Sequence, residues 1–172
     1  YDYSEFLQAY PIKICQYKNV EERRRFVGIS IVDRVIFRVL NQFFAYPDRW
    51  RIKPIMQALK NENGYDYLIS IAMPHSVHWA LGKLYQSGKR IAKIWTADCG
   101  DPFMLAATNS YKQPFYLNPL ETRWCGLCDY ITVPTPASIS GYYPEFQDKI
   151  NVIPQGFDFS EIKRKEYKKN EV

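Results

Sequence analysis

The stretch YDYLISIAMPHSVHWALGKLYQSGKRIAKIWTADCGDPF (residues 65–103) contains a complete strand–helix–strand pattern. Residues 65–72 form an apolar run that is typical of a buried strand. Residues 74–76 then open a helix, whose apolar side chains recur at helical spacing until the stop at Gly88. Residues 90–97 form the next apolar run and lead into a polar loop. The stretch therefore predicts a βαβ unit with two parallel strands.

The same alternation continues toward the C-terminus. Residues 118–128 are predicted to form a helix, with Asn118 as the N-cap, a proline after it and a glutamate three residues on. Residues 129–134 and 149–154 predict a third and a fourth strand, and another helix is expected to start at Thr135. We therefore expect an α/β fold with a parallel sheet, right-handed crossovers and helices on both faces of the sheet.

The first half of the chain is predicted to be more helical. Residues 30–44 carry a wide apolar stripe at helical spacing, which favours a helix that faces the core. A second helix is expected over about residues 52–61, with Pro54 in its first turn, and residues 12–17 are a candidate strand.

Composition sets the broad class of the protein. The chain has 172 residues, of which 47% are apolar and 24% charged, and this balance excludes a disordered or collagen-like chain. It has no apolar run of about 18 residues, so we expect no membrane-spanning helix. Four cysteines are too few for a disulfide-dense protein, and we expect a reduced, cytoplasmic one.

The formal net charge of +5 is modest, and its densest part is EERRR at residues 21–25. A solvated face is the ordinary reading of such a run, and a contact with anionic lipid or a phosphorylated substrate is the alternative. We expect no nucleic-acid partner. Because the chain starts without a methionine and ends in a charged tail, we also expect it to be a piece of a longer protein.

Candidate functional residues follow the strands, because ligands of open parallel sheets bind at the carboxyl ends of strands. In the loop at 98–102, Asp98 and Asp101 flank Gly100, where burial and like charge would perturb a working carboxylate. Simple turn chemistry explains the same residues equally well. At the loop 73–76, a helix N-terminus suits a phosphate or carboxylate, unless Ser76 or His75 merely caps the helix. His78 lies one turn into this helix. We expect it to be a histidine whose ring nitrogens are hydrogen-bonded within the fold or to solvent, and not a catalytic residue. The third such loop covers residues 155–158.

The segment Trp124-Cys125-Gly126-Leu127-Cys128 has the spacing of a redox pair or of half a zinc site. Both cysteines fall near the C-terminal end of a predicted helix, where the helix dipole disfavours a thiolate. The sequence has no second pair with this spacing. We therefore expect neither redox chemistry nor a metal here.

Five segments, in this order and spacing, resemble the N-terminal, acceptor-side domain of GT-B glycosyltransferases of the large retaining family 4 type, which builds lipopolysaccharide and capsular polysaccharide. They are YPDRW (46–50), YDYLISIAMPHSVH (65–78), WTADCGDPF (95–103), LETRWCGLCDYITVPTPA (120–137) and INVIPQGFD (150–158). The resemblance covers about two thirds of the chain, and it departs from the family pattern at Gly100, which replaces an arginine, and at Phe103, which replaces a tryptophan.

The resemblance implies a Rossmann-like domain over residues 1–158, one half of a GT-B enzyme, without its first strand and Gly-rich loop. Residues 159–172 would be an interdomain linker or the start of a donor-binding domain. The implied activity is metal-independent transfer of a sugar, with retention, from a nucleotide-sugar to a glycan or lipid-linked acceptor in lipopolysaccharide, O-antigen or capsule synthesis. No cofactor is implied. The implied location is the cytoplasm, with peripheral contact at the inner face of the membrane.

The resemblance also assigns roles to single residues. Asp101 is expected to be catalytic and to contact the acceptor or the transferred sugar. The expected substrate-binding residues are Asp98, His75, Ser76 and Gly100. Gln155, Gly156 and Asp158 are expected at the hinge, with Gly156 at positive φ and Asp158 as a cap. Glu121 is expected to be a helix-start residue.

Two other classes of function stay open at the level of sequence. One is a non-catalytic Rossmann-like module that binds a partner or docks at a membrane, which the 16% of aromatic residues favours. The other is a thiol oxidoreductase that uses Cys125 and Cys128.

Overall fold

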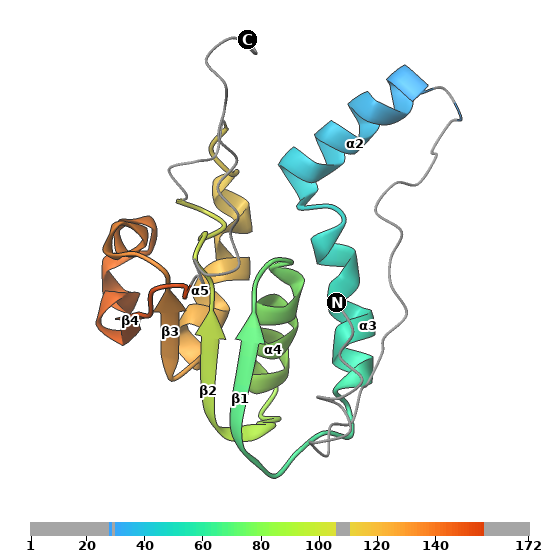
Figure 1. Ribbon diagram of the computed structural model, residues 1–172. Coiled ribbons are helices and arrows are strands. Elements are labelled where there is room, and N and C mark those ends of the chain that lie inside the picture. Colours follow the sequence, from blue (N-terminus) through green and yellow to red (C-terminus); the bar gives the residue numbers. More distant parts are fainter. Residues whose placement is uncertain (1–27, 29, 106–110, 157–172) are drawn as a thin grey trace, which may run out of the picture.

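The computed structural model describes residues 28, 30–105 and 111–156. Its centre is a four-stranded sheet in the order β1-β2-β3-β4, and every neighbouring pair is parallel (Figure 1). The strands are β1 (Tyr65–Ile71), β2 (Ala92–Asp98), β3 (Tyr130–Val133) and β4 (Ile150–Val152). The predicted α/β class, parallel sheet and four strands are confirmed. The candidate strand at 12–17 and the basic run at 21–25 lie outside the described residues.

The helices follow the predicted order, with two differences. They are α2 (Ser30–Phe44), α3 (Asp48–Ala58), α4 (Ser76–Gln86) and α5 (Asn118–Leu127), with 3-10 turns η1 (Phe115–Leu117), η2 (Pro136–Gly141) and η3 (Pro144–Lys149). The prediction that α3 starts near residue 52 was wrong, because the helix begins at Asp48 and Pro54 lies inside it. The helix expected after Thr135 is replaced by two 3-10 turns, and a proline opens each of them.

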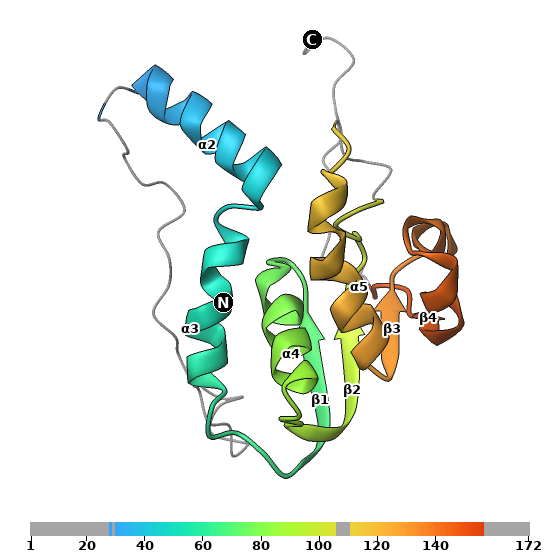
Figure 2. The same ribbon diagram turned by 180° about the vertical axis from the view of Figure 1, so that it is seen from behind.

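Helices α4 and α5 pack side by side on one face of the sheet, and α3 lies against α4 (Figure 2). Right-handed crossovers that add strands in one direction place all their helices on the same face, and the order β1-β2-β3-β4 adds them in one direction. On the other face, Tyr67, Ile69 and Ile71 of β1 are exposed, and Tyr67 keeps 71% of its surface. Helices on that second face stay a prediction for residues outside the described part.

The core lies between the sheet and its helices. Large buried side chains fill it, among them Trp79, Trp95, Trp124, Tyr142, Leu81, Leu117 and Ile131. At Gly82, a Cβ atom would lie 3.0 Å from the Cβ of Trp124, so glycine permits the close approach of α4 and α5.

Helix α2 does not face the core, contrary to the prediction. It projects beyond the end of α3, away from the sheet (Figure 1). Its residues Ile31 and Val35 are 65% and 55% exposed, and Val39 is exposed as well. An apolar stripe shows that a helix has one apolar side, but it does not say which surface covers that side. Among the described residues, the side chains that pack against α2 cover only part of its apolar side.

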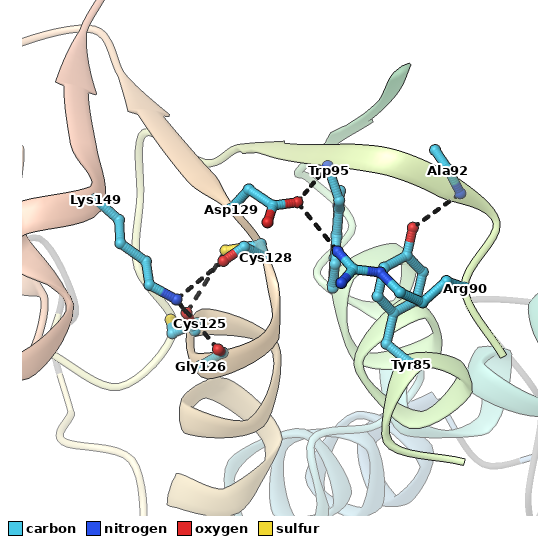
Figure 3. Close-up of polar contacts among 9 residues, drawn as sticks. All are labelled: Tyr85, Arg90, Ala92, Trp95, Cys125, Gly126, Cys128, Asp129 and Lys149. Carbon is cyan, nitrogen blue, oxygen red and sulfur yellow. Dashed lines mark hydrogen bonds and ion pairs between the residues drawn. The ribbon is translucent and has the colours of Figure 1, made fainter. Parts of the chain in front are cut away.

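Polar groups at the end of the sheet where the strands begin are tied together. The Asp129 carboxylate accepts hydrogen bonds from the backbone N–H of Trp95, at 2.8 Å, and from Arg90, at 3.4 Å (Figure 3). The guanidinium of Arg90 lies 5.3 Å from the centre of the Tyr85 ring. The Tyr85 hydroxyl in turn accepts the backbone N–H of Ala92, at 3.2 Å. These contacts fix β2 to α4 and β3.

Lys149 closes the C-terminus of α5 at the same end of the sheet. Its Nζ donates to the carbonyl oxygens of Cys125, Gly126 and Cys128, at 3.0, 3.1 and 2.9 Å (Figure 3). The last carbonyls of a helix have no partner within the helix and carry the negative end of its dipole. One ammonium group therefore satisfies three of these acceptors.

Candidate functional site

A cavity of about 780 Å³ opens at the carboxyl ends of the strands. This is the edge of an open parallel sheet where ligands are expected. The residues that line the cavity come from β1, β2 and β3 and from the loops that follow all four strands. The polar ones are Thr96, Asp98, Asp101, Thr132, Thr135, Ser138 and Gln155. Its volume lies within the range of small-molecule sites. The edge of the sheet that the sequence selected therefore does carry a cavity.

The two predicted carboxylates both line this cavity, but they are held differently. Asp98 is the last residue of β2, and its Oδ1 accepts a hydrogen bond from the Thr132 hydroxyl of β3, at 2.7 Å. Asp101 is exposed, and its carboxylate makes no hydrogen bond or ion pair with any residue that the structure describes. Its backbone carbonyl accepts a hydrogen bond from the Cys99 thiol, at 3.4 Å. The Asp101 carboxylate thus stands on a fixed backbone and faces open space.

Glu121 holds the loop that carries Asp101. It lies in the first turn of α5 but is buried, and its carboxylate accepts the backbone N–H groups of Phe103, at 2.6 Å, and Met104, at 3.1 Å. Burial raises the pKa of Glu121 to about 7, although the two hydrogen bonds act to lower it. The sequence indicated only a helix-start residue, because Phe103 and Met104 lie 18 and 17 positions away from Glu121 and no local pattern predicts such a contact.

Gly100 also lines the cavity. A Cβ atom at this position would lie 2.9 Å from the Cδ of Pro134, so a larger residue would force the two loops apart.

The predicted N-cap of α5 was wrong. Asn118 is the first residue of the helix and makes no side-chain capping bond; its buried Oδ1 has no partner among the residues that the structure describes.

A buried chain of hydrogen bonds supports the end of β2. The indole N–H of Trp95 donates to the Ser70 hydroxyl, at 2.8 Å, and that hydroxyl lies 2.8 Å from Nδ1 of His78. Nε2 of His78 lies 3.3 Å from the backbone carbonyl of Asp98. Because the Asp98 carbonyl can only accept, Nε2 carries the imidazole proton, and Nδ1 of the neutral ring accepts the proton of the Ser70 hydroxyl.

His78 is therefore a satisfied core histidine, as expected. Its pKa is lowered to about 3, mainly by burial and to a smaller extent by the charge of His75, and the bond to the Asp98 carbonyl opposes both. The residue is neutral at pH 7 and acts on the site only by fixing the backbone of Asp98.

His75 and Ser76 are absent from the lining of the large cavity. Both are buried, and neither makes a capping bond at the start of α4, so the alternative that one of them caps the helix was wrong. His75 packs against the rings of Trp79, at 5.9 Å, and Phe103, at 5.5 Å. Burial lowers the pKa of His75 to about 4, while the Asp101 carboxylate acts to raise it. Their predicted contact with substrate finds no support in this geometry.

The third loop is only partly described. Gln155 lines the cavity. Gly156 is exposed and does not have the positive φ that we expected of it; the glycines at positive φ among the described residues are Gly28, Gly64 and Gly88. Asp158 lies outside the described residues. The hinge role of these residues stays a prediction.

The cysteine pair lies far from solvent. Cys125 and Cys128 are buried at the C-terminal end of α5, as free thiols. Burial raises the pKa of Cys128 to about 12 and that of Cys125 well above its ordinary value, although Lys149 acts to lower both. Neither thiol has the exposure or the acidity of a redox cysteine.

The described residues offer neither a metal-binding cluster nor a membrane-spanning helix. They contain no group of three or more His, Cys, Asp or Glu side chains placed to hold a metal ion. Among the same residues, no helix combines the length and apolarity that a bilayer crossing needs.

The fold and the cavity together define an α/β protein with a Rossmann-like parallel sheet and a polar site at its carboxyl edge. No protein-family model, curated protein or solved structure matches this chain. The function therefore has to be argued from the site.

Proposed function

We propose that this chain is the acceptor-side domain of a retaining GT-B glycosyltransferase. The enzyme moves a sugar from a nucleotide-sugar to a glycan or lipid-linked acceptor in lipopolysaccharide, O-antigen or capsular polysaccharide synthesis, in the cytoplasm. The supporting observation is the cavity at the carboxyl edge of the sheet, which Asp98 and Asp101 line together with the hydroxyl-bearing residues Thr96, Thr132 and Ser138.

This set of groups matches the chemistry of a sugar. Each sugar hydroxyl both donates and accepts hydrogen bonds, so a sugar site needs carboxylates as acceptors and hydroxyls as mixed partners. Asp98 already accepts from Thr132, whereas the Asp101 carboxylate is open to the cavity. We assign to Asp101 the contact with the acceptor or the transferred sugar. The nucleotide and its leaving diphosphate are assigned to a second domain, where amides and basic side chains stabilise the charge without a metal.

The test of this proposal is Asp101→Asn, which removes the charge but keeps the shape. Sugar transfer per folded enzyme in the intact protein should fall about 100-fold. Asp66→Asn is the matched control. Asp66 is an exposed carboxylate near the start of β1, outside the cavity lining, and it pairs with Lys93 at 2.6 Å. Unchanged transfer by Asp101→Asn would remove the assigned role. Loss in both variants would show that the effect is not specific to the site.

We also place the enzyme at the inner face of the membrane, through α2. Ile31, Val35 and Val39 are exposed along the helix, and Arg34 and Arg38 accompany them. The exposed ring of Phe115 lies on a neighbouring segment that contacts α2 through the adjacent Tyr116. An apolar helix face beside basic residues suits the surface of an anionic bilayer.

Vesicle sedimentation tests this placement. The protein should bind vesicles that contain phosphatidylglycerol and bind phosphatidylcholine vesicles less. Val35→Asp should weaken binding, and Gln86→Glu, which makes the same change of charge on exposed α4 surface, should not. Equal binding by both variants would exclude α2 as the contact. Vesicle binding without any sugar transfer would favour the second candidate function, a non-catalytic membrane-docking module.

A further inference from the structure

Four basic side chains gather on the solvent side of the helical layer. The helices α3, α4 and α5 lie side by side there (Figure 2). Close contact between Gly82 and Trp124 joins α4 to α5, and the neighbouring positions 83 and 123 are both basic. We call the group the basic patch; it consists of Arg49 and Lys53 on α3, Lys83 on α4 and Arg123 on α5.

The four charges of the basic patch lie close enough to act on one another. Partial burial lowers the pKa of Lys83, and so do the positive charges of the other three members. Every charge that shifts this pKa is positive. On α3, Arg49 and Lys53 are four positions apart, which places them on the same side of that helix. The patch is therefore one feature of the surface and not four separate side chains.

The helices α3, α4 and α5, which the structure describes in full, hold no carboxylate that pairs with the basic patch. α4 contains no acidic residue, and α3 and α5 contain one each. Asp48 pairs with Arg51, at 2.9 Å, and Glu121 is buried against the loop that carries Asp101. No member of the patch forms an ion pair with a residue that the structure describes. Like charges that gather without a counter-charge repel one another, so this surface is suited to a partner that supplies negative charge.

A groove opens beside the basic patch, between α4 and α5. It has a volume of about 310 Å³ and is lined by Gln86, Pro119, Thr122, Arg123 and Leu127. Arg123 thus belongs to both the patch and the groove. Pro119 and Leu127 make part of the lining apolar. The groove therefore offers a place for an apolar side chain next to a cation.

We infer that the basic patch and the groove beside it bind an acidic segment of a partner protein, with carboxylates on the patch and one apolar side chain in the groove. Carboxylates form charge-assisted hydrogen bonds with Lys and Arg, and the planar guanidinium of Arg binds them through two parallel bonds. Protein interfaces commonly combine an apolar centre with a polar and charged rim. Binding of such a segment at this surface does not depend on the proposed function.

Other anionic partners fit the two features less well. The basic patch covers three helices, and the axes of packed helices lie about 8–10 Å apart, so one phosphate group cannot contact all four cations. A bilayer surface is flat on this scale and does not reach into a groove between two helices. A protein segment with both acidic and apolar side chains reaches the patch and the groove together.

Fluorescence anisotropy of labelled peptides tests the inference in the intact protein. The probe is a peptide of five Glu-Glu-Leu repeats, and the matched peptides replace every leucine with serine or every glutamate with lysine. The probe should bind saturably, and its dissociation constant should rise about tenfold when sodium chloride goes from about 0.05 M to about 0.3 M. The serine peptide should bind about tenfold more weakly, because it has no apolar side chain to bury in the groove.

The lysine peptide carries the charge of the basic patch itself and should not bind. A probe that does not bind, or a matched peptide that binds as tightly as the probe, would overturn the inference.

Charge reversals locate the binding. Arg123→Glu should raise the dissociation constant of the probe about tenfold. Lys53→Glu repeats the test at an exposed position of a second helix, should Arg123→Glu fail to fold. Lys112→Glu is the matched control, because it makes the same change at an exposed lysine that lies on none of the three helices. Equal effects of the reversals inside and outside the patch would overturn the inference.

Vesicles separate a protein partner from a membrane. If Arg123→Glu weakens binding to phosphatidylglycerol vesicles as strongly as it weakens peptide binding, the basic patch belongs to a membrane contact and the inference is overturned.

The outcomes also separate the two proposals. Sugar transfer that depends on Asp101, without any peptide binding, would leave the proposed function standing and reject the protein partner. Peptide binding that depends on Arg123, in a protein that transfers no sugar, would support the protein partner and reject the transferase.

Discussion

The two ends of the parallel sheet use their polar groups in opposite ways. Where the strands begin, Asp129 accepts two hydrogen bonds and Lys149 donates three, and these contacts join neighbouring elements. Where the strands end, Asp101 faces a cavity of about 780 Å³ and has no hydrogen-bond partner for its carboxylate among the described residues. Charges that are paired within the fold serve stability, and charges that a fold holds open are available to a ligand.

The largest expected effect lies between the two ends, at His78. In His78→Leu, the Ser70 hydroxyl loses its acceptor in the core, and the Asp98 carbonyl loses one of its two donors and keeps the backbone N–H of Ala72, at 2.9 Å. The free energy of unfolding should fall by about 3 kcal/mol in urea denaturation. His75→Leu is the matched control, because Nδ1 of His75 has no hydrogen-bond partner within the described part of the chain, and it should cost less than about 1 kcal/mol. Equal losses would mean that the hydrogen-bond chain contributes nothing specific.

A smaller effect is expected at the end where the strands begin. Lys149→Met leaves three carbonyl oxygens at the end of α5 without their donor, and should lower the free energy of unfolding by about 2 kcal/mol. Lys93→Met is the control, because its ion pair with Asp66 is exposed and such pairs contribute about 0.5 kcal/mol. If the free energy of unfolding falls by the same amount in both variants, Lys149 contributes no more than an ordinary surface lysine.

Glu121, the buried carboxylate that holds the Asp101 loop, should make the stability of the fold depend on pH. Its pKa is raised from 4.5 to about 7, so its contribution to stability is complete below about pH 4.5 and is lost as the pH rises through 7. The two histidines act in the opposite sense, because their lowered pKa values make their contribution complete above pH 6.5 and lost as the pH falls toward 4 and 3.

Glu121→Gln isolates the first contribution. The stability of the wild type relative to Glu121→Gln should fall by about 1 kcal/mol per pH unit between pH 5 and pH 7 in urea titrations. A difference that stays constant with pH would show that Glu121 keeps an ordinary pKa.

The smallest effect on stability is expected at the open end of the sheet. Asp101→Asn should change the free energy of unfolding by less than about 0.5 kcal/mol, because no hydrogen bond of its carboxylate is lost. Thermal unfolding measures this in the same preparations as the transfer assay. A large loss of stability would show that Asp101, like Asp129 and Lys149 at the opposite end of the sheet, is a paired charge that stabilises the fold. The contrast between the two ends of the sheet would then be wrong.

Several elements could be predicted from local pattern alone. Apolar runs located the four strands, and the positive φ of Gly88 agrees with its place as the stop after α4. The rule for parallel sheets selected the loop that carries Asp98 and Asp101, and both do line the cavity. These predictions succeed because strand and helix periodicity, and the edge at which strands end, are properties of short segments.

Other features depend on pairs of residues that lie far apart in the chain. Glu121 braces residues 103 and 104, and Trp95 reaches Ser70 across 25 positions, contacts that no local pattern encodes. The exposed stripe of α2 and the burial of His75 were likewise decided by what packs against them.

The sequence by itself therefore determined the class of fold and the edge of the sheet where a ligand would bind, because both follow from the order of periodic segments. Only the tertiary structure decided which carboxylate faces the cavity and which one braces a loop. Such contacts arise only when distant segments pack together.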